Sequence, residues 1–428
     1  MRLLIFTLIF VIVHVAQLGA QSHKYPIEDF YYRSVELPID YQNPQMGTFY
    51  QFYQLSSNFD FARPTLFFFQ DIAQQFGMPG EIDRLAKEYH FFADFNVVYY
   101  QIRGRQYSFI ELRNPDGSVN WEKAYTLLSA NLVIEDIERI RRDLFKENPE
   151  TKILAFGRSG GGFLIQRYLS KYSQYVSRAF IRAAPNSIIM KQLGYPESKY
   201  FYNTLNTVDS TLYAKLKVIL KKEIIPDYKL FWILRNIPYA SENPGQEFQL
   251  LINDLYNGEK QVYQQYVQNS RFDFSKWKKS EQDMNLRDIG MYFAPLEVSA
   301  EYMLDPDPDY IDPFYGCLKK LAEPYIKLIQ EEKVTIPTFP PLETFKKVET
   351  EVFYLAGRND HVSDFRIGIE LGKYFKNYEL FIADDNHTMS INEECYPLLR
   401  NTFFKYGIGS HELQKVKTSQ LCKEWIQN

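Results

Sequence analysis

The sequence predicts an α/β protein with a mostly parallel sheet, helices on both faces of it, and a largely helical insertion. Three observations predict this class. Short apolar segments recur and end in turn residues, helical patterns lie between them, and one long middle segment lacks the alternation. Strand–helix alternation is typical of parallel sheets covered on both faces. The chain has 428 residues and is 45% hydrophobic, which excludes a disordered protein.

The first 20 residues have the layout of a secretory signal peptide. A positive start at Met1-Arg2 precedes an apolar run, and small residues lead to Ala20 before a polar Gln21. We expect cleavage after Ala20, which makes the mature protein exported, either secreted or periplasmic. The alternative is an uncleaved membrane anchor, because the run is nearly long enough to span a bilayer. We expect no stable membrane span after cleavage.

The strand and helix patterns then follow in order. Residues 32–56 are typical of an antiparallel pair joined by a turn. Apolar runs predict buried strands at 64–70, 95–104, 152–157, 178–185, 350–357 and 378–384. Helical patterns occupy 130–148, 163–172 and 367–375. These segments assign 21–185 and 346–428 to one α/β domain.

Residues 186–345 form the insertion, which we interpret as a cap or lid. The segment is rich in Tyr, Lys and Glu, is helical in places, and closes with Pro337, Pro340 and Pro341. The whole chain is 17% aromatic, and several aromatic runs lie in this segment. They either line a pocket or pack the cap helices together, and we expect packing for most of them.

Charge and cysteine content exclude several classes of protein. The 49 basic and 53 acidic residues leave a net charge of −4, without the basic excess of a nucleic-acid binder. Three cysteines are too few for a disulfide scaffold. Two arrangements of these cysteines are open. Cys395 and Cys422 form a disulfide, or all three cysteines, including Cys317, are buried thiols. CxxC and HExxH are absent, so we expect no metal site and no cofactor.

The strongest local motif is G-x-S-x-G at residues 157–161, GRSGG. It ends a predicted strand and opens a predicted helix, which is the context that a nucleophile elbow needs. The tight turn would present the Ser159 hydroxyl above the sheet edge. The backbone N–H of Gly160 would then face a developing oxyanion. A glycine-rich phosphate loop is the alternative, but its G-x-G-x-x-G and G-x-x-x-x-G-K patterns are absent.

A serine nucleophile needs a base, and six histidines are available. The order serine, acid, histidine along this kind of chain leaves His361, His387 and His411. We choose His387, because it follows a predicted strand and opens a loop. The sequon Asn386-His387-Thr388 is then accidental, since a glycan there would block the base.

Asp360 is the predicted acid that orients the histidine. It stands just past the strand 350–357, where the sheet edge delivers a loop residue into the site. Asp364 is the second choice. A solvated loop carboxylate is the ordinary role of either residue.

Several segments resemble a known family. VELPIDYQNPQMGTF (35–49) and QIRGRQYS (101–108) resemble its early strand pair and its arginine–glycine segment, and NLVIEDIERIRRDL (131–144) resembles the helix before its nucleophile. YLAGRNDHVSD and LFIADDNHTM match its acid and histidine segments. The chain therefore resembles the α/β-hydrolase superfamily, and within it the exported prolyl and tripeptidyl aminopeptidases. The resemblance implies the α/β-hydrolase fold and a serine hydrolase activity.

The sequence departs from that family at the loop that supplies a second oxyanion donor. The family's HGGPG is replaced by QDIA at residues 70–73. We expect the backbone N–H of Asp71 to donate there. Its carboxylate brings a negative charge close to a site that must stabilise one.

The family resemblance also implies cap carboxylates that bind a free α-ammonium. FAPLEVSAEY (293–302) resembles the relevant family segment, which places Glu297 on its glutamate, with Glu301 nearby. These two residues are the candidate substrate-binding groups. A solvated cap glutamate is the ordinary alternative.

Three functions remain after this comparison. The first is a serine aminopeptidase of prolyl or tripeptidyl type that acts on a peptide through Ser159, Asp360 and His387. The second is a carboxylesterase or lipase that uses the same residues on a small ester. The third is a weak or inactive binding protein on the same fold. The sequence does not determine the oligomeric state.

Overall fold

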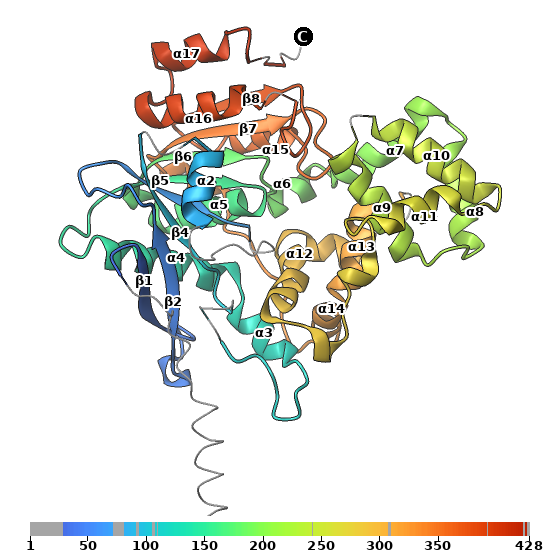
Figure 1. Cartoon of the computed structure of the whole chain (residues 1–428), viewed down its shortest axis with the longest axis horizontal. Helices are drawn as coiled ribbons and strands as arrows, with labels where there is room; N and C mark the ends of the chain where they lie inside the picture. Colours follow the sequence, from blue (N-terminus) through green and yellow to red (C-terminus); the bar gives the residue numbers. More distant parts are fainter. Residues whose placement is uncertain are drawn as a thin grey trace, which may run out of the picture.

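The computed structural model describes residues 29–71, 81–90, 94–104, 108, 110–241, 243–306, 310–391, 393–422 and 424–425. The predicted signal peptide, residues 1–20, lies outside them, as do residues 72–73 of the departing loop. A sheet with its covering helices forms one side of the molecule, and a helical part forms the other (Figure 1). In the part of the chain that the structure describes, no helix has the length and apolar character to cross a membrane.

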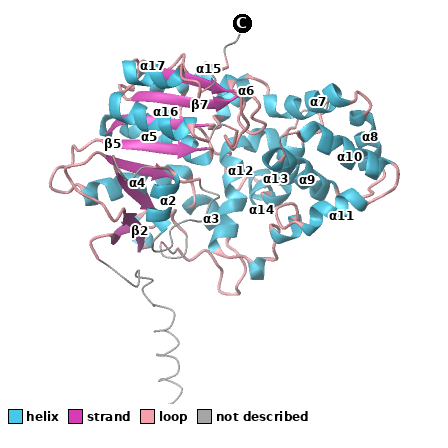
Figure 2. Cartoon of the chain, turned by 45° about the horizontal axis from the view of Figure 1, so that its top comes forward, coloured by secondary structure: helices cyan, strands magenta, loops and turns pink. Residues whose placement is uncertain are grey.

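Eight strands form one sheet in the order β1-β2-β4-β3-β5-β6-β7-β8. β1 and β2 form an antiparallel pair, β2 lies antiparallel to β4, and all other neighbours are parallel. The strands run side by side in Figure 2, with helices in front of and behind them. Their bounds are Tyr32–Pro38 (β1), Thr48–Leu55 (β2), Thr65–Phe69 (β3), Asn96–Tyr100 (β4), Ile153–Arg158 (β5), Val176–Arg182 (β6), Glu351–Gly357 (β7) and Tyr378–Ala383 (β8).

Both faces of the sheet are buried, because successive side chains of a strand point to opposite faces. In β3, Phe67 and Phe69 pack on the face that also holds apolar side chains of α4, α5 and α15, whereas Leu66 and Phe68 pack with α2, α16 and α17. The helices around the sheet are Glu81–Glu88 (α2), Trp121–Leu127 (α3), Ala130–Leu144 (α4), Gly160–Tyr172 (α5), Arg366–Leu371 (α15), Cys395–Tyr406 (α16) and His411–Lys417 (α17).

The predicted strands and the helices α4, α5 and α15 occur within a few residues of their expected bounds. α5 begins at Gly160, directly after the proposed nucleophile, and α4 ends at Leu144 rather than 148. The fold class is therefore confirmed. Short 3-10 turns complete the described elements at Pro44–Met46, Ser173–Tyr175, Phe274–Lys276, Glu281–Asp283 and Leu342–Lys347.

The segment around Arg103 forms a buried polar network beneath the strands. The Arg103 guanidinium is paired with Asp136 at 2.7 Å, and Tyr41 donates to the same carboxylate at 2.8 Å. Ser108 accepts a hydrogen bond from the Phe52 N–H. Buried charges need such complete pairing, so this segment has a structural role.

The insertion is helical, and its buried side chains divide into two groups. Helices α12, α13 and α14 contribute to the same core as α4 and α5, whereas α7, α8 and α10 build a second core. α9 belongs to both, since its Trp232 lies in the first core and its Ile233 in the second. The helices are Ser187–Gln192 (α6), Pro196–Val208 (α7), Leu212–Lys221 (α8), Asp227–Ala240 (α9), Pro244–Tyr256 (α10), Gln261–Gln268 (α11), Leu286–Leu304 (α12), Pro313–Leu321 (α13) and Glu323–Gln330 (α14). We call α7–α11 the outer cap and α12–α14 the inner cap.

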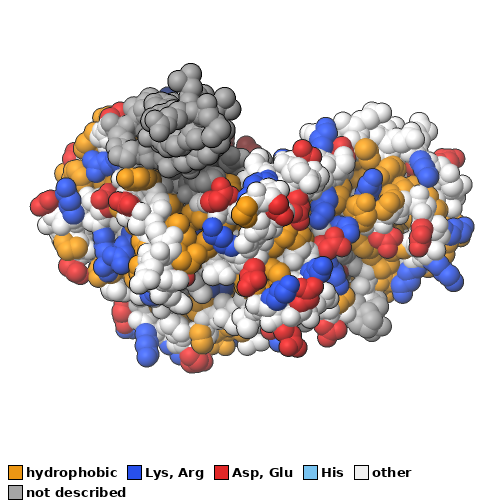
Figure 3. Space-filling view, turned by 90° about the horizontal axis from the view of Figure 1, so that it is seen from below, with side chains coloured by type: hydrophobic (Ala, Val, Ile, Leu, Met, Phe, Trp, Pro, Cys, Tyr) orange, Lys and Arg blue, Asp and Glu red, His pale blue; other side chains and the backbone are white. Residues whose placement is uncertain are grey.

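The cysteines adopt the first of the two expected arrangements. Cys395, at the start of α16, forms a disulfide with Cys422 in the C-terminal segment. Cys317 is a buried free thiol. The surface seen in Figure 3 has acidic and basic side chains interspersed, in keeping with the near balance of charge.

Candidate active site

Ser159 lies on the tight turn between β5 and α5. Its backbone has φ 50° and ψ −123°, a strained conformation for a residue with a side chain. The turn is closed by glycines: a Cβ at Gly161 would lie 2.0 Å from the Phe69 carbonyl oxygen, and one at Gly157 would lie 2.6 Å from the Gly161 backbone. Glycines therefore occupy positions 157 and 161, because the start of the helix passes directly over two strands.

The structure brings Ser159, His387 and Asp360 together in one hydrogen-bonded chain. His387 Nε2 lies 3.2 Å from Ser159 Oγ, and its Nδ1 lies 2.8 Å from Asp360 Oδ2. A carboxylate at Nδ1 favours the tautomer whose Nδ1–H donates to it, which leaves Nε2 free to accept the serine proton.

Asp360 is held in place by its own loop. Its Oδ1 accepts hydrogen bonds from the N–H groups of Val362 and Ser363, at 2.7 and 2.9 Å. The residue is buried. Its carboxylate is therefore fixed before it meets the imidazole.

The other residues considered from sequence lie elsewhere. Asp364 forms an ion pair with Arg366 at 2.7 Å, and His411 begins α17 on the surface. The Asn386 side chain accepts hydrogen bonds from the N–H and hydroxyl of Thr388, so it belongs to the turn that carries His387.

Two aromatic groups pack against the histidine: Tyr239, which the sequence analysis missed, and His361, which it considered only as an alternative base. Tyr239 of α9 stands perpendicular to the His387 ring at 5.7 Å, and His361 lies 6.4 Å from it. Burial, followed by the proximity of His387 and Arg235, holds the pKa of His361 well below its usual value. His361 is thus a neutral packing partner at neutral pH. Its place beside Asp360 in the chain was the only available signal.

The oxyanion donor differs from its expected arrangement. The Gly160 N–H donates to the Asp71 carboxylate, with Oδ2 at 3.2 Å. The Asp71 side chain thus occupies the position that the sequence analysis reserved for a substrate oxygen, while donation by its backbone N–H stays a prediction. Gly160 accommodates it because a Cβ there would lie 2.6 Å from Asp71 Cγ.

Neither predicted cap glutamate is brought to the serine. Glu297 is buried, and its Oε1 accepts from the N–H of Ala130 at the start of α4, at 2.8 Å. This hydrogen bond fastens α12 to α4, although burial raises the pKa of Glu297. Glu301 is exposed and forms an ion pair with Lys191 of α6. Their expected role as amine ligands is therefore not supported by their positions.

Ser159 and His387 open into a cavity of about 620 Å³ between the carboxyl ends of the strands and the cap. Aromatic side chains line much of it: Phe163, Trp232, Tyr239, Trp277, Phe314 and Tyr315. Four arginines also line it, namely Arg158, Arg182, Arg235 and Arg271, whereas Asp71 is the one acidic residue among the described lining residues. Substrate would therefore meet apolar surface and positive charge.

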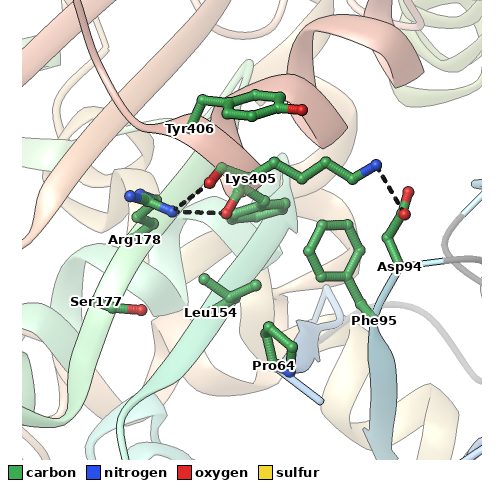
Figure 4. A pocket seen from close by; sticks show the side chains of 9 residues that line it. Pro64, Asp94, Phe95, Leu154, Ser177, Arg178, Lys405 and Tyr406 are labelled. Carbon is green, nitrogen blue, oxygen red and sulfur yellow. Dashed lines mark hydrogen bonds and ion pairs between the residues drawn. The ribbon is translucent and has the colours of Figure 1, made fainter. Parts of the chain in front are cut away.

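A second hollow of about 520 Å³ lies at the opposite edge of the sheet, below the amino end of β6 (Figure 4). Its charged groups already have partners. Arg178 binds Glu351 and the Phe404 carbonyl, and Lys405 forms an ion pair with Asp94. We assign it no ligand. Among the described residues, no group of three histidine, cysteine or acidic side chains is placed to bind a metal ion.

An eight-stranded, mostly parallel sheet with helices on both faces and a serine on the turn after a central strand is the architecture of the α/β hydrolases. No family profile and no curated protein sequence matches the chain. Among solved structures it is similar to an alpha/beta hydrolase enzyme from a Medee basin deep-sea metagenome library, at 13% identity and TM-score 0.40, over 83% of this chain and 94% of that one.

Two further structures have comparable similarity. An esterase from Exiguobacterium antarcticum is 12% identical at TM-score 0.40, over 83% of this chain and 96% of its own. A proline iminopeptidase from Mycobacterium smegmatis is 12% identical at TM-score 0.39, over 82% of this chain and 89% of its own. These values are low and the activities differ, so conclusions about chemistry depend on the residues of this chain.

Proposed function

We propose that the protein is a serine hydrolase that cleaves a carboxylic ester or amide through an acyl-enzyme. The observation that carries the proposal is the hydrogen-bonded chain from Asp360 through His387 to Ser159, on a strained turn that faces a cavity. Strain of this kind persists where the surrounding structure enforces it, and it is common at nucleophiles.

The proposed reaction has two halves. Ser159 Oγ attacks the substrate carbonyl while His387 Nε2 takes its proton, and the leaving group departs with that proton. Water then attacks the acyl-enzyme, again giving its proton to His387, and Ser159 regains a proton as the acid is released. Asp360 keeps the imidazole oriented and stabilises its cation in both halves.

The oxyanion of each half needs a donor, and Gly160 N–H is the available one at the start of α5. In the free protein this N–H is bound to the Asp71 carboxylate. Substrate must therefore displace that carboxylate. We expect hydrolysis to be slower here than at a site whose oxyanion donor is free.

We place ester hydrolysis ahead of aminopeptidase activity. An aminopeptidase needs a carboxylate for the substrate ammonium group, and Glu297 and Glu301 lie outside the cavity lining. Asp71 is the remaining acidic candidate there, and the four arginines of the lining would repel a cation.

A phosphonate probe and two reporter series test the proposal. Fluorophosphonate should label the folded wild-type protein and a Ser57→Ala control, whose serine is exposed, but not Ser159→Ala. Short-chain aryl esters should be hydrolysed faster than aminoacyl amides. Absence of both labelling and turnover in folded protein would instead support a binding protein, and faster amide turnover would restore the aminopeptidase hypothesis.

We also propose that the mature protein is exported. The expected signal peptide and the Cys395–Cys422 disulfide support this location, because disulfides persist in oxidising compartments. Mass spectrometry of protein recovered outside the cytoplasm should find an N-terminus at Gln21. Recovery of an intact Met1 in the membrane fraction would contradict it.

A further inference from the structure

Two arginines stand beside the nucleophile at the carboxyl edge of the sheet. Arg158 ends β5 and directly precedes Ser159, and Arg182 ends the neighbouring strand β6. The two residues are register partners across the parallel pair. The Ser159 N–H donates to the Arg182 carbonyl oxygen at 2.8 Å, so the strand that carries Arg182 is fixed to the elbow. Both arginines line the cavity that contains Ser159.

In the described part of the chain, no ion pair joins either guanidinium to a carboxylate. The charge of Asp385 acts on Arg182 without an ion pair between them. The Nε of Arg182 is buried without a hydrogen-bond partner. Burial, and then the nearby Arg158 cation, lower the pKa of Arg182 to about 10. Two neighbouring guanidinium groups with an unmet donor are unfavourable unless an anion binds them.

A purely structural role accounts for only part of this arrangement. Arg158 lies over the Tyr89 ring at 5.7 Å, a cation–π contact that would stabilise one charge. Two buried arginines elsewhere bind carboxylates, Arg103 with Asp136 and Arg141 with Glu138. Arg167 and Arg400 are also buried and bind carbonyl and amide oxygens instead. Arg182 differs from all of these because it lines the cavity that contains Ser159.

The opposite wall of the cavity is mostly apolar. The cap contributes Trp232, Trp277, Met291, Val298, Phe314 and Leu318, and also two arginines, Arg235 of α9 and Arg271. A ligand that fills the cavity therefore meets the paired cations of the sheet beside Ser159 and mostly aromatic or aliphatic side chains at the cap. This combination fits a molecule with an apolar body and one anionic end.

We propose that Arg158 and Arg182 bind an anionic oxygen group of the substrate, a carboxylate or a phosphate, while its apolar body packs against the cap. The inference rests on the proposed function, and it narrows the substrate class to amphipathic anionic esters. The planar forks of two arginines suit the paired oxygens of either group.

Matched aryl esters test the preference directly. In one series the charge is on the acyl group: 4-nitrophenyl hydrogen adipate against 4-nitrophenyl hexanoate. In the other it is on the leaving group: phenyl butyrate bearing 4-carboxylate or 4-phosphate, against 4-carboxamide. The wild-type kcat/KM should favour the anionic member at least about tenfold in one series. The carboxylate and phosphate arms show which of the two groups the arginines prefer.

Neutral variants locate the effect. Arg158→Gln and Arg182→Gln should each lower the anionic-to-neutral ratio of kcat/KM by about 10- to 100-fold, because each removes charge-assisted hydrogen bonds. Arg63→Gln is the matched control, since that exposed arginine precedes β3 at the opposite sheet edge. It should keep the wild-type ratio.

Binding without turnover separates the two proposals. Ser159→Ala should be stabilised against heat by octanoate or octyl phosphate and not by octanamide, and Arg182→Gln should remove that shift. Equal kcat/KM for neutral and anionic esters, with Ser159-dependent hydrolysis intact, would overturn the arginine site and leave the proposed function standing. Anion binding without hydrolysis of any ester would support the arginine site and overturn the proposed function. If Arg182→Gln unfolds, Arg158→Gln decides.

Discussion

At the scale of single residues, the site is a set of side chains held by their own loops. Asp360 accepts two backbone hydrogen bonds before it reaches His387, and Tyr239 and His361 pack around the imidazole. The polar groups are therefore oriented in the free protein. Such preorganisation is what allows a proton to move without further rearrangement.

Replacement of Asp360, the proposed acid, should affect activity far more than replacement of Asp364, its neighbour in the loop. Asp360→Asn should lower kcat on an aryl ester by about 10³- to 10⁴-fold, because the amide no longer enforces the tautomer that leaves Nε2 as acceptor. Asp364→Asn is the control, since its carboxylate binds Arg366 away from the imidazole. Similar losses in both variants would contradict the assignment of Asp360.

Removing the charge of Asp71 should accelerate the reaction. Asp71→Asn weakens the contact that occupies the Gly160 N–H, so kcat/KM for a neutral ester should rise by about tenfold. Asp116→Asn, in an exposed turn, is the control. A loss confined to substrates with a free amine would show instead that Asp71 is an amine ligand.

His361 predicts a pH dependence of stability. Its pKa in the folded protein lies well below 6.5, whereas the unfolded chain takes up a proton near 6.5. Unfolding therefore becomes easier as pH falls through and below 6.5, because the unfolded chain takes up a proton that the folded protein excludes. His361→Asn should lose that part of the slope in urea unfolding, whereas parallel curves for both proteins would show that His361 is protonated when folded.

At the scale of elements, the elbow connects three parts of the fold. β5 delivers Ser159, α5 starts directly after it, and β3 passes beneath the glycines. The Ser159 side chain is thereby placed at the sheet edge by the backbone rather than by its own contacts. Its position should accordingly be sensitive to the glycines.

Gly161→Ala should destabilise this junction. The added Cβ would meet the Phe69 carbonyl oxygen at 2.0 Å, which forces β3 and α5 apart and should cost about 3 kcal/mol or more. Gly258→Ala is the comparison, since it has φ +86° in open space and should cost about 1 kcal/mol. Denaturant unfolding of both variants gives the difference, and equal losses would contradict the close approach.

The sequence predicted these elements well where a local pattern sets them. Apolar runs marked the six parallel strands, and small residues marked the elbow. Contacts between distant segments carried no such pattern. Glu297 binds the start of α4, 167 positions earlier in the chain, and Asp71 reaches Gly160 across 89 positions. Their side-chain roles depend on how the cap and the β3 loop pack, so a motif could locate these residues without giving their partners.

At the scale of the whole molecule, the sheet and the inner cap share one core, and the outer cap has a second core that α9 links to the first through Trp232. The cavity is bordered by both: Trp232 and Tyr239 come from α9, whereas Val298 and Leu318 come from the inner cap. The disulfide, in contrast, joins α16 to the C-terminal segment on the sheet face that α16 covers. Stability of the sheet and shape of the cavity thus depend on different contacts.

Loss of the disulfide should lower overall stability. Cys395 and Cys422 are 27 positions apart. A link of this length restricts the unfolded chain and should contribute about 3 kcal/mol to the free energy of unfolding. The Cys395→Ser/Cys422→Ser protein should unfold at lower urea than oxidised wild type and match wild type in reductant. Unchanged unfolding after reduction would show that the bond contributes nothing.

The second core, in the outer cap, has a kinetic consequence. Helices α7, α8 and α10 can lose their packing without exposing the interior of the sheet, so their amides should exchange with solvent before those of β5 and β6. Opening of that kind would widen the entrance while Ser159, His387 and Asp360 stay in register. The rate at which large molecules enter and leave would then be governed by leucine and isoleucine side chains that never meet them.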